Sequence, residues 1–107
     1  MTLLTSQQVF AAAVPKLINK ALSMGYSVTL GDAYRDPRVH GVFGVKASYA
    51  AAESEHKRRL AIDINLFKDG RFLSSSADHE PLGRYWESIG GIWGGYNDGN
   101  HYQWPLT

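Results

Sequence analysis

The stretch from Leu60 to Phe67 constrains the fold more than any other part of the chain. Apolar and polar side chains alternate along it, with Ile62, Ile64 and Leu66 on one face and Asp63 and Asn65 on the other. Because successive side chains of a strand point to opposite faces, this alternation predicts a β-strand with one apolar face. An aspartate within such a strand is costly unless it is paired or bound to a cation.

Two segments with helical periodicity lie on either side of this strand in the sequence. The first contains Val14, Leu17, Ile18, Ala21 and Leu22, and the second contains Leu82, Tyr85, Trp86 and Ile89. Pro15 has no N–H, so we expect a kink or a restart of the first helix there. Shorter strands are expected at 26–30, 72–73 and 100–104, with a hairpin turn at 68–71 and a short helix after Pro37. We predict an α+β fold: one small domain, residues 1–107, with a central antiparallel sheet and helices packed on it.

The charge and the N-terminal segment exclude several classes of partner. The formal net charge is +1, so the dense basic face of a nucleic-acid-binding protein is not expected. The basic run at 57–59 is interpreted as solvated surface rather than as a polyanion site. Residues 1–10 lack the basic region and the long apolar run of a signal peptide, and no membrane span is predicted. We expect a monomer that is made in the cytoplasm without a signal peptide.

Two segments each carry one histidine and one aspartate at close spacing: His56 with Asp63, and Asp98 with His101. The chain has no cysteine, so any zinc must be held by histidine and carboxylate, as in catalytic sites. A catalytic zinc needs three protein ligands, an open position and a nearby general base. The hypothesis is that His56, Asp63 and His101 hold zinc at one side of the sheet and that Asp98 is the base.

Each of these residues also has a simpler interpretation. Asp63 could form a salt bridge with Arg58 or Arg59, and Asp98 could be a turn residue in Asn-Asp-Gly. A lone His101 is more often a core or surface histidine than a ligand. The two remaining histidines, His40 and His79, are interpreted as exposed.

The residues also resemble a known family. They contain Ser54-x-His56, Ala61-x-Asp63 and Asp98-x-x-His101, with Trp93-Gly94-Gly95 ahead of the last motif. This pattern is similar to that of the zinc peptidases that include D-alanyl-D-alanine carboxypeptidases and phage L-alanyl-D-glutamate endopeptidases. Further segments resemble the phage, endolysin-like branch: 25–26, 29–31, 33–35, 65–70 and 81–83. The resemblance runs from about residue 10 to residue 104.

The resemblance implies roles for five residues. His56, Asp63 and His101 match the zinc ligands, Asp98 matches the catalytic base, and Arg35 matches an arginine that steadies the substrate carbonyl as it becomes an oxyanion. A fixed guanidinium suits that work because it stabilises charge that appears only in the transition state. The simpler interpretation of Arg35 is an ordinary loop salt bridge with Asp32 or Asp36.

The expected function is zinc-dependent hydrolysis of peptidoglycan stem peptides, most simply as an endopeptidase that cuts L-Ala–D-Glu and lyses the cell wall. The alternatives are a D-Ala-D-Ala carboxypeptidase, a non-catalytic module that recognises the cell wall, and a small zinc-storing or zinc-sensing protein. Zinc is the expected cofactor, and the substrate is the expected partner. The enzyme would reach the wall by holin-type release or another route of delivery.

Overall fold

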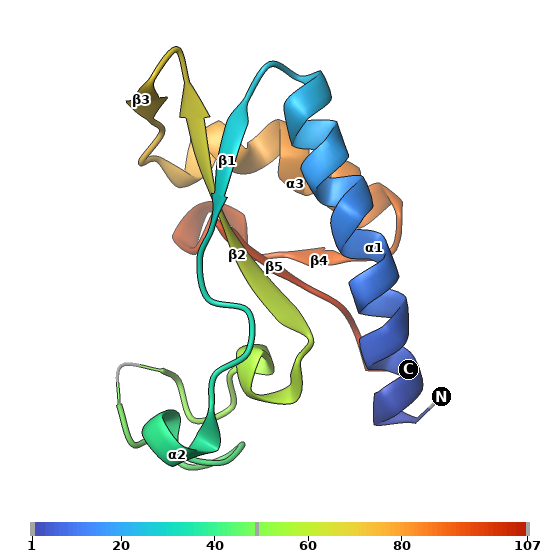
Figure 1. Cartoon of the computed structure of the whole chain (residues 1–107), viewed down its shortest axis with the longest axis vertical. Helices are drawn as coiled ribbons and strands as arrows, with labels where there is room; N and C mark the ends of the chain where they lie inside the picture. The colour runs from blue at the N-terminus through green and yellow to red at the C-terminus, as the bar shows by residue number, and fades with distance from the viewer. Residues whose placement is uncertain (1, 49, 107) are drawn as a thin grey trace.

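The fold is described from a computed structural model covering residues 2–48 and 50–106 (Figure 1). Its elements, in chain order, are α1 Leu3–Ser23, β1 Ser27–Leu30, α2 Pro37–His40, η1 Glu55–Arg58, β2 Ala61–Lys68, β3 Arg71–Phe72, η2 Ser76–His79, α3 Glu80–Ser88, β4 Ile92–Trp93, η3 Gly95–Asn97 and β5 His101–Gln103. The prefix η marks short 3₁₀ helices. The predicted α+β class with an antiparallel sheet is confirmed.

Strand β2 is the centre of the sheet, whose order is β1-β2-β5-β4, with β3 also paired to β2. All pairings are antiparallel. The first part of β2 pairs with β5, from Ala61 opposite Gln103 to Asp63 opposite His101. The second part pairs with β1, from Ile64 opposite Leu30 onward. Asp63 therefore lies where the partner of β2 changes.

The hydrophobic core lies between the sheet and two helices. The alternation in β2 is confirmed, because Ile62, Ile64 and Leu66 are buried while Asp63 and Asn65 are partly exposed. The buried face meets α1 and α3, whose core residues are Phe10, Ala13, Leu17, Ala21, Leu82 and Trp86. In Figure 1, α1 runs beside the sheet and α3 crosses behind it. The opposite face of β2 is left uncovered by these helices, which makes it available for a site.

Of the kink or restart predicted at Pro15, the restart does not occur, because α1 continues from Leu3 to Ser23 through this residue. Proline removes a helical hydrogen bond, but the buried stripe on either side of Pro15 packs against the core. Tertiary burial thus outweighs the local cost.

Among the described residues, no helix is long and apolar enough to cross a membrane.

The segment between β1 and β2 projects away from the sheet and contains α2, at the lower end of Figure 1. The basic run at 57–59 lies near the end of this segment, and the prediction that this run is solvated is wrong for Lys57, which is only 9% exposed. The Lys57 ammonium donates to the Val45 carbonyl at 2.5 Å and so holds the projecting segment. The guanidinium of Arg59 lies over the ring of Tyr34, 4.0 Å from its centroid.

Candidate metal centre

Asp63 and His101 face each other across β2 and β5. The backbone groups of these two residues do not bond to each other. The N–H of Asp63 donates to the Asp32 carbonyl, and the C=O of Asp63 accepts from the Gly31 N–H. The N–H of His101 donates to the Asp98 carbonyl, and the C=O of His101 accepts from the Gly94 N–H. They are therefore a non-hydrogen-bonded pair, the type in which opposite side chains are closest. His101 Nδ1 lies 3.5 Å from Asp63 Oδ1.

His56 reaches the same carboxylate from η1, just before β2. The side chain of Ser54 caps η1 by accepting from the His56 N–H at 3.3 Å. The ring is 1% exposed, its Nδ1 donates to the Ala33 carbonyl at 3.0 Å, and its Nε2 lies 3.1 Å from Asp63 Oδ1. Because the carbonyl can only accept, Nδ1 carries a proton, so Nε2 of the neutral ring turns its lone pair toward Asp63.

The three side chains form a donor set that fits zinc. One donor atom from each of His56, Asp63 and His101 lies within 4.8 Å of the others. The 3.1 and 3.5 Å separations are close to the edge of a tetrahedron with bonds of about 2.0–2.1 Å, roughly 3.3 Å. His101 Nε2 donates to the Gln103 side chain at 2.8 Å, so Nδ1 of the neutral ring also turns its lone pair inward. Lone pairs converging on a carboxylate require a proton or a cation between them.

The charges in this cluster favour the anionic form of Asp63. Burial raises the pKa of the Asp63 carboxyl. When a proton rather than a cation lies between the carboxylate and the rings, hydrogen bonds from His101 and His56 outweigh burial and hold the pKa below its usual range. Burial also lowers the pKa of the His101 imidazole, but its contacts with Asp63 and Gln103 raise it above the ordinary value. The aspartate is thus present as the carboxylate that a metal ligand must be.

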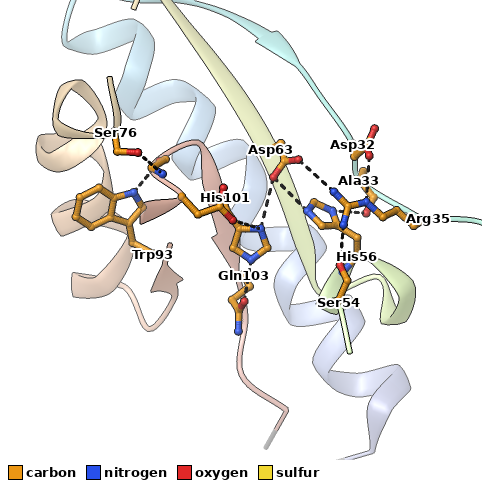
Figure 2. A network of polar contacts seen from close by, with 12 residues as sticks. Asp32, Ala33, Arg35, Ser54, His56, Asp63, Ser76, Trp93, His101 and Gln103 are labelled. Carbon is orange, nitrogen blue, oxygen red and sulfur yellow. Dashed lines mark hydrogen bonds and ion pairs between the residues drawn. The ribbon is translucent and has the colours of Figure 1, made fainter. Parts of the chain in front are cut away.

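Arg35 is fixed beside the cluster by several contacts (Figure 2). Its Nε donates to Asp32 Oδ2 at 3.1 Å, and one terminal nitrogen donates to Ser54 Oγ at 3.0 Å. The other terminal nitrogen lies 3.9 Å from Asp63 Oδ2. The expected salt bridge with Asp32 is therefore present, and it also orients the guanidinium toward Asp63, one of the three candidate ligands. A planar, pre-oriented donor of this kind can stabilise a developing oxyanion.

A tight turn presents Asp98 beside His101, whereas Arg35 lies beside Asp63. Gly94 N–H donates to the His101 carbonyl, and Asp98 N–H donates to the Gly95 carbonyl. A Cβ at Gly94 would lie 2.1 Å from the Asp98 carbonyl oxygen, so only glycine permits this close approach. The Asp98 side chain is 62% exposed, with Oδ2 at 3.8 Å from His101 Nδ1. Asp98 is thus close to the cluster and open to solvent, where a carboxylate can accept a proton from water.

A cavity of about 360 Å³ brings the predicted residues together, since Arg35, His56, Asp63, Asp98 and His101 all line it. A neighbouring cavity of about 200 Å³ shares Asp98 with it. Five residues separated by up to 66 positions in the sequence therefore meet at one site on the uncovered face of β2.

The family model described as D-alanyl-D-alanine carboxypeptidase matches residues 48–104, which is more than half of the chain. The chain belongs to this family. A comparison with curated proteins gave no match. The matched segment contains His56, Asp63, Asp98 and His101, while Arg35 precedes it. Membership makes the chain a peptidoglycan-related peptidase of a zinc-dependent family, in agreement with the resemblance seen in its motifs.

In this member of the family, the alternative partners predicted for Asp63 are not used. Arg58 pairs with Glu55 instead, and Arg59 stacks on Tyr34. Asp63 is left to the two histidines and Arg35.

The interpretation of His79 as a surface residue is wrong, because it is 3% exposed and its Nδ1 bonds to the Tyr102 hydroxyl at 2.8 Å. His40 is half-buried rather than exposed, and its ring contacts Ser48 Oγ. Neither histidine lines the cavity that contains the candidate ligands.

Two supporting residues of the peptidase site had no predicted role. Ser54 joins the η1 cap to Arg35, and Gln103 orients the His101 ring. Gln103 follows His101 by two positions in a strand, so the same-face rule could have identified it. Ser54 belonged to the Ser-x-His motif, but its bond to Arg35 spans 19 positions and no local pattern indicates it.

Proposed function

We propose that this chain is a zinc-dependent endopeptidase that cuts peptidoglycan stem peptides between L-Ala and D-Glu. The observation that carries the proposal is the single cavity lined by His56, Asp63, His101, Arg35 and Asp98. In it, His56, Asp63 and His101 would hold zinc. When bound, zinc supplies a Lewis acid that activates water and polarises a carbonyl.

The roles of the other two residues follow from their contacts. Asp98 is solvent-exposed and close to His101, so its carboxylate takes a proton from the attacking water and returns it to the leaving amine. Arg35 is held by Asp32 and Ser54, so its guanidinium donates to the oxyanion without reorganising. The nitrogen leaving the scissile bond then lies on the Asp98 side, and the carbonyl oxygen lies on the Arg35 side.

The choice of an endopeptidase over a D-Ala-D-Ala carboxypeptidase rests on the space beyond Asp98. A carboxypeptidase releases a single residue, whereas an endopeptidase must accommodate a peptide that continues past the cut. The second cavity, of about 200 Å³, extends beyond Asp98. A chain that continues past the cut can occupy this opening. The likeness to the phage branch agrees with release of the enzyme to the cell wall by a holin or another delivery route.

Digestion of purified sacculi tests this proposal, with new termini identified by mass spectrometry. New N-terminal D-Glu and C-terminal L-Ala are expected, whereas release of free D-Ala would indicate the carboxypeptidase. Asp98→Asn should keep zinc and lose about 10²–10⁴-fold in kcat, because the amide cannot accept the proton. If Asp98→Asn loses its metal instead, Asp98 is a ligand and the assignment of Asp63 is wrong.

A further inference from the structure

The second cavity, beyond Asp98, has walls of a different chemistry from the metal centre. Amide and hydroxyl side chains dominate it, and we call it the asparagine–serine pocket: Asn65, Ser74, Ser75, Ser76, Asn97 and Asn100. Asn65 and Asp63 lie two positions apart in β2 and share its uncovered face. The pocket therefore continues the surface of the metal centre along the same strand.

The charge in the asparagine–serine pocket is negative. Asp98 lines it, while Arg35, His56 and His101 line the metal cavity instead. His79 also lines it, but burial lowers the pKa of this imidazole, so the ring is neutral near pH 7. An anion in this pocket would therefore face Asp98, with no cationic side chain among the described residues of the wall.

Three backbone N–H groups along the serine wall have partners within the protein. Ser75 N–H donates to the Asp78 carboxylate, Ala77 N–H to Ser75 Oγ, and Gly99 N–H to Ser76 Oγ. Backbone N–H groups can cradle a carboxylate, and these three are already engaged. Asp78 places a further negative charge behind this wall.

We propose that the asparagine–serine pocket is the subsite for the leaving half of the substrate and that it selects a carboxamide over a carboxylate on the residue after the cut. The inference rests on the proposed function, in which that residue is D-Glu linked through its γ-carboxyl. Its free α-carboxylate would be repelled by Asp98. The corresponding D-isoglutamine residue is neutral, and its amide can both donate to and accept from asparagine and serine side chains.

The test uses two synthetic muramyl peptides that are identical except for this group, N-acetylmuramyl-L-Ala-γ-D-Glu-L-Lys and its D-isoglutamine counterpart. The zinc-loaded enzyme should cut the amidated peptide with kcat/KM higher by about three- to ten-fold, the effect of unit-charge repulsion across a solvated pocket. The difference should shrink as salt is added, because salt screens exposed charges.

A matched pair of variants locates the effect. Asn97→Lys places a cation on the exposed rim of the pocket and should abolish or reverse the preference. Asn19→Lys adds the same charge on the exposed side of α1 and should leave it unchanged. Zinc content and melting temperature of both variants are measured first.

Equal rates for the two peptides, or a preference for the carboxylate, would overturn the subsite while leaving the peptidase proposal intact. An unchanged preference in Asn97→Lys would also overturn it. If neither peptide nor sacculi are cut by the zinc-loaded enzyme, the proposed function fails, and the subsite fails with it.

Discussion

The two walls of the metal cavity are built in different ways. Asp63 and His101 stand on paired strands backed by the core, so sheet register sets their separation. Arg35 belongs to the loop wall, residues 31–48 and 50–54 ahead of η1, which is held to η1 by individual contacts such as Arg35 N–H to the His56 carbonyl and Lys57 to Val45. The outer part of this segment leaves Val39 and Val42 exposed. His56, on η1 directly before β2, belongs with the sheet wall, so all three candidate ligands lie outside the loop wall. The difference implies that metal affinity depends on the sheet wall and that substrate handling depends on the loop wall.

The largest expected effect comes from the sheet wall. His101→Ala should lose most of its zinc and essentially all of its activity, because one of three ligands is gone. Metal analysis of protein purified without added zinc measures this, with His40→Ala as the control that removes a histidine outside the cavity. Full zinc retention in both His56→Ala and His101→Ala would refute the metal site.

The next effect comes from the loop wall. Arg35→Lys keeps the charge but loses the planar donor fork, so kcat should fall by roughly 10²–10³ with a smaller change in KM and unchanged zinc. Arg38→Lys, on an exposed arginine of the same segment, is the control. A lower melting temperature with near-normal kcat would assign Arg35 a structural role and weaken the comparison between the walls.

A smaller effect is expected where the loop wall is anchored. Lys57→Met removes the buried ammonium that binds the Val45 carbonyl while keeping the length of the side chain. The free energy of unfolding should fall by about 1–3 kcal/mol, and KM should rise several-fold, with zinc retained. Lys16→Met, at an exposed position of α1, should change neither quantity. Loss of zinc in Lys57→Met would mean that the loop wall also sets metal affinity.

The smallest effect concerns His79, behind the sheet wall. Burial lowers its pKa, so below its ordinary value of 6.5 the unfolded chain binds a proton that the folded chain does not. Stability should therefore fall as the pH drops below 6.5, by up to about 1.4 kcal/mol for each unit of lowered pKa. His79→Gln keeps a polar side chain but cannot titrate, so chemical denaturation should show a flatter profile between about pH 5 and 6.5. Identical profiles would show that His79 contributes nothing to the pH dependence.

The sequence predicts the sheet wall better than the loop wall, for a physical reason. Alternation in β2 is a local signal of which side chains share a face, so Asp63 could be placed on the uncovered face before the structure was known. Burial of Lys57 and His79 depends on contacts with residues 12 and 23 positions away. Both have charged or polar neighbours in the sequence, and local composition therefore indicated exposure incorrectly.

The pairing of Asp63 with His101 also has a consequence for how the chain misfolds. A slip of one position between β2 and β5 would turn one of the two side chains to the opposite face of the sheet. A misregistered molecule could keep its helices and much of its buried surface, yet it could not gather the three donors. If these residues hold zinc as proposed, the zinc content of a preparation measures the fraction of correctly registered molecules. Helix content alone would not reveal the molecules with the wrong register.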